Sequence, residues 1–255
     1  MRKDLIVLLV GAFIVSLTVV VPRAPQSIAP QVTQVRGAVV HVAKAGSCES
    51  SGCLISSDGI LFTARHVTGG DPCGTYVVTL DSGAQYPVKY VLEDREADLS
   101  YMKLDLPKGV TTPWVVLAPA DSLRVGDPVI IAGSPLGRQN INTFSLGIVS
   151  ALDRDLDYKW HAMIQTTGPA YPGNSGGAIF NMEGRVVGVL VAGQGDCLNF
   201  GVPVIFLRES VKAVRQWFVL CRIRPLQPDM RGPRGPTGSQ GGQITEPNDG
   251  QGIDS

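Results

Sequence analysis

Residues 173–177 constrain the local fold of this chain more than any other segment. They read Gly-Asn-Ser-Gly-Gly, so one serine, Ser175, stands in a glycine-rich turn where no bulky side chain crowds its hydroxyl. Glycine lets the backbone take conformations that are closed to other residues. A turn of this kind can direct two backbone N–H groups at one point, where a carbonyl oxygen could become an oxyanion. Ser175 is therefore a candidate nucleophile.

A serine hydroxyl is a weak nucleophile until a base takes its proton, and that base is most often a histidine. The chain has three histidines. His66 follows an apolar strand-like run and precedes a polar turn, so its ring can project into a cleft. Asp98 begins another strand-like run and could orient that ring. His41 and His161 lack such a setting, and we interpret them as structural.

Each candidate also has a simpler interpretation. Ser175 could be a turn serine, His66 a surface residue at the end of a strand, and Asp98 a strand cap. The three residues together, in the order His, Asp, Ser, favour nucleophilic catalysis over three separate explanations.

The composition favours many short strands. Of 255 residues, 30 are glycine and 18 are proline, and aromatic residues make up only 6%. Such a chain suits an all-β fold of many short strands joined by tight turns. Lys plus Arg and Asp plus Glu both number 22, so the net charge is zero and no basic surface indicates nucleic-acid binding. No His or Cys cluster has the spacing of metal ligands, so we predict neither a metal site nor a cofactor.

Several segments, taken in order, resemble serine proteases of the HtrA/Deg type, whose trypsin-like (chymotrypsin) fold has two six-stranded antiparallel β-barrels. The likeness covers about residues 34 to 220. The segments that carry it are 52–63, 97–99, 125–137, 145–150, 164–167, 173–177 and 184–189. Asp98 follows His66 by 32 residues and Ser175 follows Asp98 by 77, which is close to the family's spacing. Several weak motifs in the right order make a strong signal.

The resemblance implies a role for each residue of the site. Ser175 would attack the scissile carbonyl, His66 would take its proton and later pass it to the leaving amine, and Asp98 would hold the imidazole. The turn of Gly173, Asn174 and Ser175 would form the oxyanion hole, with the N–H groups of Gly173 and Ser175 as donors. The chain would be a serine endopeptidase that cuts proteins or peptides through an acyl-enzyme intermediate, in extracytoplasmic proteolysis or quality control.

In this family, the residue six places before the serine helps to shape the pocket for the substrate side chain that precedes the cut. Here that residue is Pro169. Ala192, Gly193 and the strand over residues 199–202 would line the other wall. Because no carboxylate stands at position 169, the resemblance predicts small or medium apolar side chains rather than Arg or Lys.

A second class of function is a peptide-binding module on the same fold. Such a module would be non-catalytic, or it would be active only when a partner orders the oxyanion turn. A peptide can dock as an added strand without being cut, and a fold does not by itself decide a function. The complete set of His66, Asp98 and Ser175 favours the enzyme.

We expect the protease domain to span residues 34–220. Its barrels would cover about residues 34–112 and 113–206, and an apolar stripe at helical spacing predicts a C-terminal helix over residues 208–220.

The composition changes after that helix. Residues 221–255 are rich in glycine and proline and predict a disordered tail. A tail of this kind leaves no room for the PDZ domain that many HtrA-type proteases carry, so we expect a member of the family without one. Trimers are common among such proteases, and the sequence leaves an oligomer open.

The first 22 residues predict a membrane-spanning helix that acts as a signal-anchor. Residues 5–21 form an uncharged run of 17, which is at the lower end of the length that crosses a bilayer. Arg2 and Lys3 would stay in the cytoplasm and place the protease outside it, on a single-pass anchor.

The alternative to an anchor is a signal peptide that is cleaved to release a secreted enzyme. A small-x-small site occurs at residues 27–29, but Pro30 would follow the cut and hinder the peptidase. Residues 23–33, which follow Pro22 and contain two more prolines, predict an extended linker between the membrane and the protease.

The chain has five cysteines, namely Cys48, Cys53, Cys73, Cys197 and Cys221. Some could pair outside the cytoplasm. A bridge between Cys48 and Cys73 would resemble the one beneath the catalytic histidine in trypsin relatives. The alternative is free thiols, which behave as small hydrophobic side chains when buried.

Overall fold

The computed structural model describes residues 27–45, 49–71, 73–156, 160–195 and 197–223. The predicted anchor over residues 1–22 lies outside these ranges, as does most of the predicted tail over residues 221–255. Across the ranges that are described, no helix has both the length and the apolar character needed to cross a bilayer.

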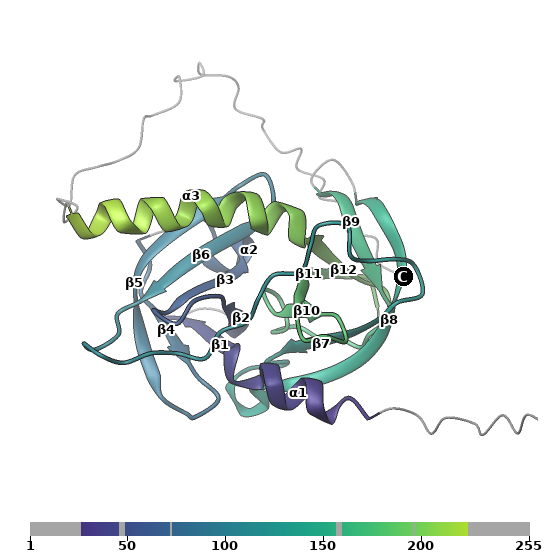
Figure 1. The fold of residues 1–255 in the computed structure, drawn as a ribbon, viewed down its shortest axis with the longest axis horizontal. Coiled ribbons are helices and arrows are strands. Elements are labelled where there is room, and N and C mark those ends of the chain that lie inside the picture. Colours follow the sequence, from purple (N-terminus) through teal and green to yellow (C-terminus); the bar gives the residue numbers. More distant parts are fainter. Residues whose placement is uncertain (1–26, 46–48, 72, 157–159, 196, 224–255) are drawn as a thin grey trace, which may run out of the picture. The chain divides into compact units, whose positions relative to one another are not determined.

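The first barrel closes through six antiparallel strands in the order β1-β2-β3-β6-β5-β4 (Figure 1). Its strands are β1 Val39–Lys44, β2 Glu49–Leu54, β3 Ile60–Ala64, β4 Tyr76–Thr79, β5 Gln85–Asp94 and β6 Leu99–Leu104. Every residue of β3 and β6 is buried, and Phe62 stands opposite Tyr101 in the β3–β6 register. Such aromatic cross-strand pairs help to fix a register.

The second barrel closes in the order β10-β11-β12-β9-β8-β7, again with antiparallel strands only. Its strands are β7 Pro128–Gly133, β8 Thr143–Leu156, β9 Trp160–Thr166, β10 Ala178–Phe180, β11 Val186–Gly193 and β12 Asn199–Pro203. The predicted pair of six-stranded barrels is confirmed.

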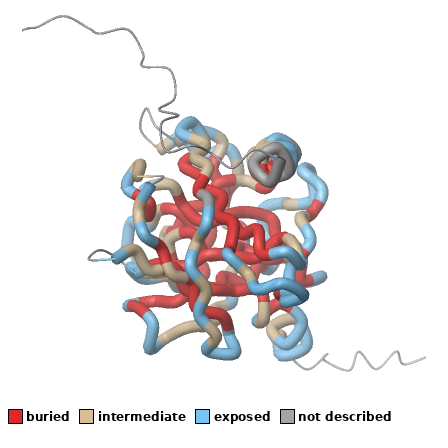
Figure 2. The backbone as a smooth tube through the Cα atoms, turned by 90° about the vertical axis from the view of Figure 1, so that its left-hand side faces the viewer, coloured by how far each residue is buried: buried red, intermediate tan, exposed pale blue. Residues whose placement is uncertain are grey.

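Buried residues, red in Figure 2, concentrate in the middle of the tube, whereas exposed residues, pale blue, lie mainly at its outer turns. In the second barrel the core includes Val129, Ile131, Ile164 and Ile179, each at most 1% exposed. Burying a Val or Ile side chain fully contributes about 1.5–3 kcal/mol. A one-residue slip in any of these strands would turn its apolar side chains out to water, so burial of the core fixes the strand register. The register in turn determines where the loops between the strands lie.

A single segment joins the barrels, and its hydrogen bonds show where the chain changes barrel. Val115 N donates to Leu54 O of the first barrel at 3.0 Å, whereas Val116 O accepts from Val186 N of the second barrel at 3.0 Å. The barrels lie within one compact unit that ends at Ser210.

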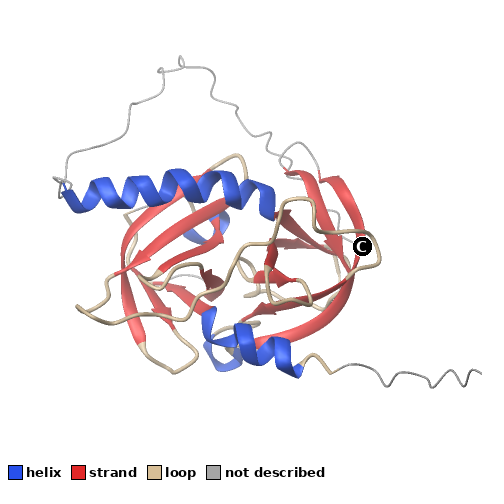
Figure 3. Ribbon diagram, in the orientation of Figure 1, coloured by secondary structure: helices blue, strands red, loops and turns tan. Residues whose placement is uncertain are grey.

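Helices occur mainly at the two ends of the described chain (Figure 3). The predicted C-terminal helix is present as α3, Val204–Ile223, which starts directly after β12 and four residues before the expected position 208. Val211, Val214 and Phe218, the predicted apolar stripe, are buried.

The predicted extended linker is wrong over its last part. Residues 29–35 form the helix α1, Ala29–Val35, followed by the 3-10 turn Arg36–Ala38. Pro30 stands in the first turn, where its missing N–H needs no intrahelical partner. Thr33 Oγ1 donates to Ala29 O at 2.8 Å, which further supports the turn. Proline therefore starts a helix here instead of extending a linker.

Candidate active site

The turn of residues 173–177 depends on its glycines. Gly173 has φ +96°, and a Cβ there would stand 2.6 Å from Ser134 O. Gly176 has φ +82°, and its Cβ would stand 2.3 Å from Ser51 O. Both backbone conformation and space therefore exclude larger residues on either side of Ser175.

Hydrogen bonds fix the peptide groups of this turn. Asn174 N donates to Tyr171 O at 3.0 Å, Gly177 N donates to Asn174 O at 2.9 Å, and Gly176 N donates to Leu190 O at 2.8 Å. Within the described part of the chain, the N–H groups of Gly173 and Ser175 donate to no acceptor. These are the two groups predicted to bind an oxyanion.

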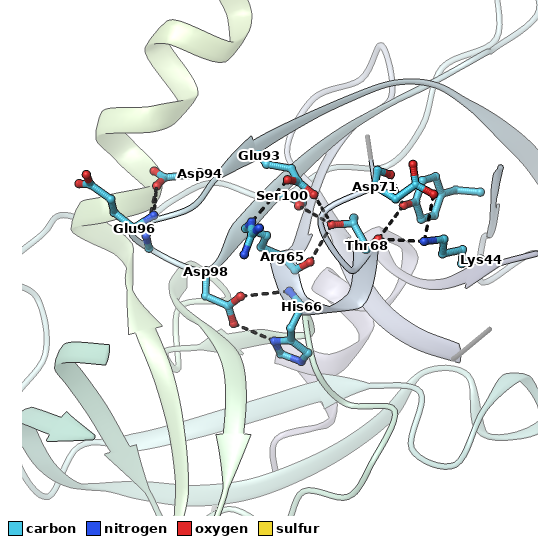
Figure 4. Close-up of polar contacts among 12 residues, drawn as sticks. Lys44, Arg65, His66, Thr68, Asp71, Glu93, Asp94, Glu96, Asp98 and Ser100 are labelled. Carbon is cyan, nitrogen blue, oxygen red and sulfur yellow. Dashed lines mark hydrogen bonds and ion pairs between the residues drawn. The ribbon is translucent and has the colours of Figure 1, made fainter. Parts of the chain in front are cut away.

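His66 and Asp98 are in direct contact (Figure 4). His66 lies on the short helix α2, Arg65–Thr68, at the end of β3, and Asp98 immediately precedes β6. His66 Nδ1 lies 2.7 Å from Asp98 Oδ2, and the backbone N–H of His66 donates to Asp98 Oδ1 at 3.0 Å. A neutral ring that donates from Nδ1 to this carboxylate keeps Nε2 available as a base.

Asp98 takes a backbone conformation that few non-glycine residues adopt. Its φ is 52°, and its carbonyl oxygen accepts a hydrogen bond from Arg65 N at 2.8 Å. The carboxylate is 10% exposed, whereas the His66 side chain is 42% exposed. The carboxylate is thus enclosed and held from both sides while the imidazole faces the solvent.

A buried carboxylate supports α2, and the sequence did not reveal it. The side chain of Glu93, at the end of β5, is 7% exposed and lies 3.4 Å from Arg65 Nε. Its other oxygen accepts from Thr68 Oγ1 at 2.5 Å (Figure 4). Because Glu93 reaches α2 only through the β5–β6 pairing, no local motif could have identified it.

The carbonyl oxygen of Thr68, at the last residue of α2, also has side-chain donors. Lys44 Nζ donates to Thr68 O at 3.1 Å. Tyr76 Oη stands 3.1 Å from the same oxygen and 2.5 Å from Asp71 O, and its one proton is shared between these two acceptors. Burial raises the pKa of Tyr76 to about 12, so its hydroxyl remains a donor across the physiological range. The helix that carries His66 is therefore tied to strands β1 and β4.

Ser175 belongs to the second barrel but lies against the first. Ser51 N, on β2, donates to Ser175 O at 3.0 Å, and a Cβ on Gly176 would stand 2.7 Å from Ala64 N, two residues before His66. Among the described residues, neither the Ser175 hydroxyl nor His66 Nε2 makes a hydrogen bond. Such bonds are often long in substrate-free sites and tighten when substrate binds.

A pocket of about 450 Å³ opens beside Ser175. Its lining includes the predicted Ala192 and Gly193, together with Leu190 and Val191. Pro169, predicted to shape the opposite wall, does not line it. The wall is formed instead by the next three residues, Ala170, Tyr171 and Pro172. The carbonyl oxygen of Pro169 accepts from Ser145 Oγ at 2.7 Å, which ties that residue to β8.

Asn199 is the deepest polar side chain of this pocket. It begins β12, is 1% exposed, and its Nδ2 donates to Gly168 O at 2.8 Å. A Cβ on Gly193 would stand 2.5 Å from Asn199 Oδ1. Glycine at 193 therefore leaves room for the amide, and none of the described residues that line the pocket is charged.

Cys53, Cys73 and Cys197 are free thiols, and a free Cys73 speaks against the expected bridge between Cys48 and Cys73. Cys48 itself lies outside the described residues. Burial raises the pKa of the Cys53 thiol, which leaves it protonated.

Comparison with protein families gives one match over more than half of the chain. Residues 50–189 match the family described as the trypsin-like peptidase domain. This range contains His66, Asp98 and Ser175.

Known relatives and solved structures agree with that match. The chain is 34% identical over 159 residues to a probable periplasmic serine endoprotease DegP-like of Chlamydia pneumoniae, covering 60% of this chain and 31% of the relative. It is 34% identical over 174 residues to the putative serine protease HhoA of Synechocystis sp., covering 66% and 42%. Two solved structures, the HtrA-type protease AlgW with a tripeptide and with a decapeptide, both superpose with a TM-score of 0.65.

The solved structures are 28% and 25% identical to this chain and cover 74% and 75% of it, and the chain covers 64% and 68% of them. The chain spans less than half the length of the two curated relatives, 31% and 42%.

Proposed function

Because this chain belongs to the trypsin-like peptidases of the HtrA/Deg type, we propose that it is a serine endopeptidase whose site is His66, Asp98 and Ser175. The observation that carries the proposal is the 2.7 Å contact between His66 Nδ1 and Asp98 Oδ2, together with a glycine-rich turn that presents two N–H groups beside the serine.

In the first half of the reaction, His66 Nε2 takes the proton of the Ser175 hydroxyl while Oγ forms a bond to the scissile carbonyl carbon. The carbonyl oxygen becomes an oxyanion that the N–H groups of Gly173 and Ser175 stabilise, and Asp98 stabilises the imidazolium. When the tetrahedral intermediate collapses, the C–N bond breaks and His66 gives its proton to the leaving amine. The product is an ester of Ser175.

In the second half, water replaces the amine. His66 Nε2 takes a proton from the water as its oxygen attacks the ester carbonyl, and the same two N–H groups hold the second oxyanion. Collapse breaks the bond to Ser175 Oγ, which recovers its proton from His66. The acid product leaves, and the site is unchanged.

The pocket supports a preference for small or medium apolar side chains before the cut. Its described lining is mainly apolar, with aliphatic residues, glycine, Pro172 and the ring of Tyr171, and its most buried polar side chain is the neutral amide of Asn199. A peptide library should therefore show cleavage after apolar residues. Asn199→Asp, which changes the amide to a carboxylate of the same shape, should raise the relative cleavage after Arg and Lys. Strict Arg or Lys preference in the wild type would contradict the proposal.

Covalent labelling tests the catalytic assignment directly. The full chain is treated with a fluorophosphonate, which needs both an activated serine and an oxyanion hole, and the site of addition is located by peptide mass. We expect one adduct, on Ser175, that is lost in Ser175→Ala and His66→Ala but kept in His161→Ala, because His161 is an exposed histidine away from the serine.

The labelling experiment also separates the competing class of function. A folded wild type that takes no label but binds peptides would support a non-catalytic or partner-gated peptide-binding module instead of the enzyme. The glycine-rich turn and the His66–Asp98 contact favour the enzyme.

We also propose an extracytoplasmic location, because a relative of this chain is named as periplasmic and residues 5–21 are uncharged. Membrane anchoring through residues 1–22 is part of the same proposal. Fractionation of cells that express the full chain, with and without alkaline carbonate extraction, would distinguish an anchored form from a secreted one. N-terminal sequencing that begins at Pro30 would exclude the anchor.

A further inference from the structure

We propose that Ser51, a buried serine of the first barrel, is a positioning residue that sets the geometry of the oxyanion turn in the second barrel. The inference rests on the proposed peptidase function and concerns a residue outside the triad. Ser51 is 0% exposed and lies on β2.

The hydroxyl of Ser51 joins two segments of the second barrel. Its Oγ donates to Gly173 O at 2.7 Å and accepts from Ser134 N at 2.7 Å. A hydroxyl has one proton, and this proton is committed to Gly173 because Oγ is the acceptor of the other bond. Ser134 begins the loop after β7, so a single side chain ties that loop to the nucleophile turn.

The backbone of Ser51 makes two further bonds. Its N–H donates to Ser175 O at 3.0 Å, and its carbonyl oxygen accepts from Thr63 Oγ1 at 2.7 Å. Ser51 therefore bonds to both ends of the segment from Gly173 to Ser175. It is itself held by the strand that leads to His66.

These bonds determine where the N–H groups of the turn point. In a trans peptide the C=O and N–H bonds point in opposite directions, so an anchored carbonyl also aims the N–H of its own peptide group. Pro172 O accepts from Leu136 N at 2.7 Å, which aims the N–H of Gly173. Asn174 O accepts from Gly177 N at 2.9 Å, which aims the N–H of Ser175.

Ser51 holds the peptide group between these two, the one whose carbonyl belongs to Gly173. Both neighbouring carbonyls are anchored by backbone N–H groups. The middle group is held at its N–H, where Asn174 N donates to Tyr171 O at 3.0 Å, and at its carbonyl by the Ser51 hydroxyl, which is the side chain that holds it. If this group rotated, the two oxyanion donors on either side would no longer converge. Catalysis is sensitive to small displacements of such donors, because a misplacement of about 1 Å can lower the rate about a hundredfold.

The neighbouring residue provides a matched control. Ser50 is 2% exposed, and its hydroxyl donates to Val42 O at 3.2 Å, within the first barrel. Ser50→Ala and Ser51→Ala therefore delete the same atom at adjacent buried positions of one strand, and only the second deletion removes a bond to the nucleophile turn.

The test compares these two variants with the wild type, using a peptide that the wild type cleaves. For Ser51→Ala we expect kcat to fall about 10- to 100-fold while KM changes by less than about twofold, because the oxyanion is stabilised mainly in the transition state. The acid limb of the kcat/KM pH profile should not move, because His66 and Asp98 are untouched. A peptide boronic acid, which forms the tetrahedral adduct, should bind more weakly by about the same factor as the loss in kcat. Ser50→Ala should keep the wild-type kcat.

Melting curves accompany each variant to separate positioning from folding. If Ser51→Ala does not fold, Thr63→Val takes its place, since it keeps the side-chain shape and removes only the bond to Ser51 O. It should lower kcat by about threefold or more. Equal kcat values for Ser51→Ala and Ser50→Ala, or a loss that follows only the folded fraction, would overturn the inference. So would an unchanged kcat in Thr63→Val. A wild type that cleaves and labels nothing would overturn the proposed function as well.

Discussion

At the scale of single residues, Asp98 combines two tasks in one carboxylate. One oxygen bonds the His66 ring and the other bonds the His66 backbone N–H, so ring and helix are placed together. The charge of this carboxylate is enclosed by the protein, and its attraction for an imidazolium is therefore stronger than it would be in water.

Asp98→Asn is expected to abolish most activity without unfolding the protein. The amide has the size of the carboxylate and tolerates a φ of 52°, but it lacks the charge and favours the wrong tautomer of His66. We expect kcat to fall by about 10⁴-fold with little change in melting temperature. A residual kcat within tenfold of the wild type would contradict the assigned role.

His41 makes stability depend on pH. It is 1% exposed on β1, neither ring nitrogen has a hydrogen-bond partner among the described residues, and Glu49 Oε1 stands 3.8 Å away. Burial lowers the pKa of His41 below its usual value near 6.5, and it outweighs the opposing effect of Glu49 at a distance too long for a hydrogen bond. Between the folded-state pKa and 6.5 the unfolded chain binds more protons, so the free energy of unfolding must fall as the pH drops through that window.

His41→Leu should remove this dependence. We expect urea titrations at pH 7.5 and pH 5 to show a smaller loss of stability for the variant than for the wild type. His161→Leu removes an exposed histidine, 65% accessible at its side chain, and should keep the wild-type loss. Equal losses in all three proteins would show that His41 is not the titrating group.

At the scale of elements, the candidate catalytic residues lie in the segments between strands, and the strands position those segments. Gly176 and Gly83 show the difference, because both have φ +82°. A Cβ on Gly83 would meet nothing within 4 Å, whereas a Cβ on Gly176 would stand 2.2 Å from Thr63 Oγ1. Gly83 is needed for its backbone conformation alone, whereas Gly176 is needed both for its backbone conformation and for the space that a side chain would fill.

Replacing each of these two glycines with alanine introduces the same backbone strain, so a comparison of the two variants isolates the effect of packing. Gly83→Ala should cost about 1–2 kcal/mol, the strain of a left-handed residue. Gly176→Ala should cost a further 1–3 kcal/mol or so from overpacking and should lose peptidase activity. Chemical denaturation of both variants measures the loss of stability, and a cleavage assay measures the loss of activity. Similar losses of stability and activity in both would contradict the packing around Gly176.

The sequence predicted the elements whose signals are local, and it missed those that depend on contacts. The glycine and proline content was enough to predict many short strands. The resemblance to HtrA/Deg-type proteases supplied the two barrels and the roles of His66, Asp98 and Ser175. The linker over residues 23–33 was expected to be extended because of its prolines, but Pro30 lies in the first turn of α1. Glu93 and Ser51 could not be found, because each acts on a partner that only the strand registers bring near.

At the scale of the whole molecule, the site exists only where the two barrels meet. His66 and Asp98 come from the first barrel and Ser175 from the second. Polar contacts help to hold that junction together. They include the bonds of Ser51 and, on the surface, Asp81, whose carboxylate accepts from Arg36 of the first barrel's edge and from Asn142 of the second barrel. The guanidinium of Arg36 lowers the pKa of Asp81, but exposed pairs of this kind contribute little to stability.

Activity should therefore be lost before structure when the protein is titrated with urea. A small separation of the barrels breaks the site while each barrel keeps its own core. We expect the urea midpoint for peptide cleavage to lie below the midpoint for the far-ultraviolet circular dichroism signal, with full recovery on dilution. Coincident midpoints would indicate that the barrels unfold and separate in one step.

The change of barrel between Val115 and Val116 has a practical consequence. Backbone bonds to the first barrel end at one residue and bonds to the second begin at the next, so a nick there would divide the molecule without opening either sheet. Encoded as two genes and fused to two test proteins, the halves would form a split reporter. Each half alone would be inactive, and peptide hydrolysis would report that the two fused proteins had associated.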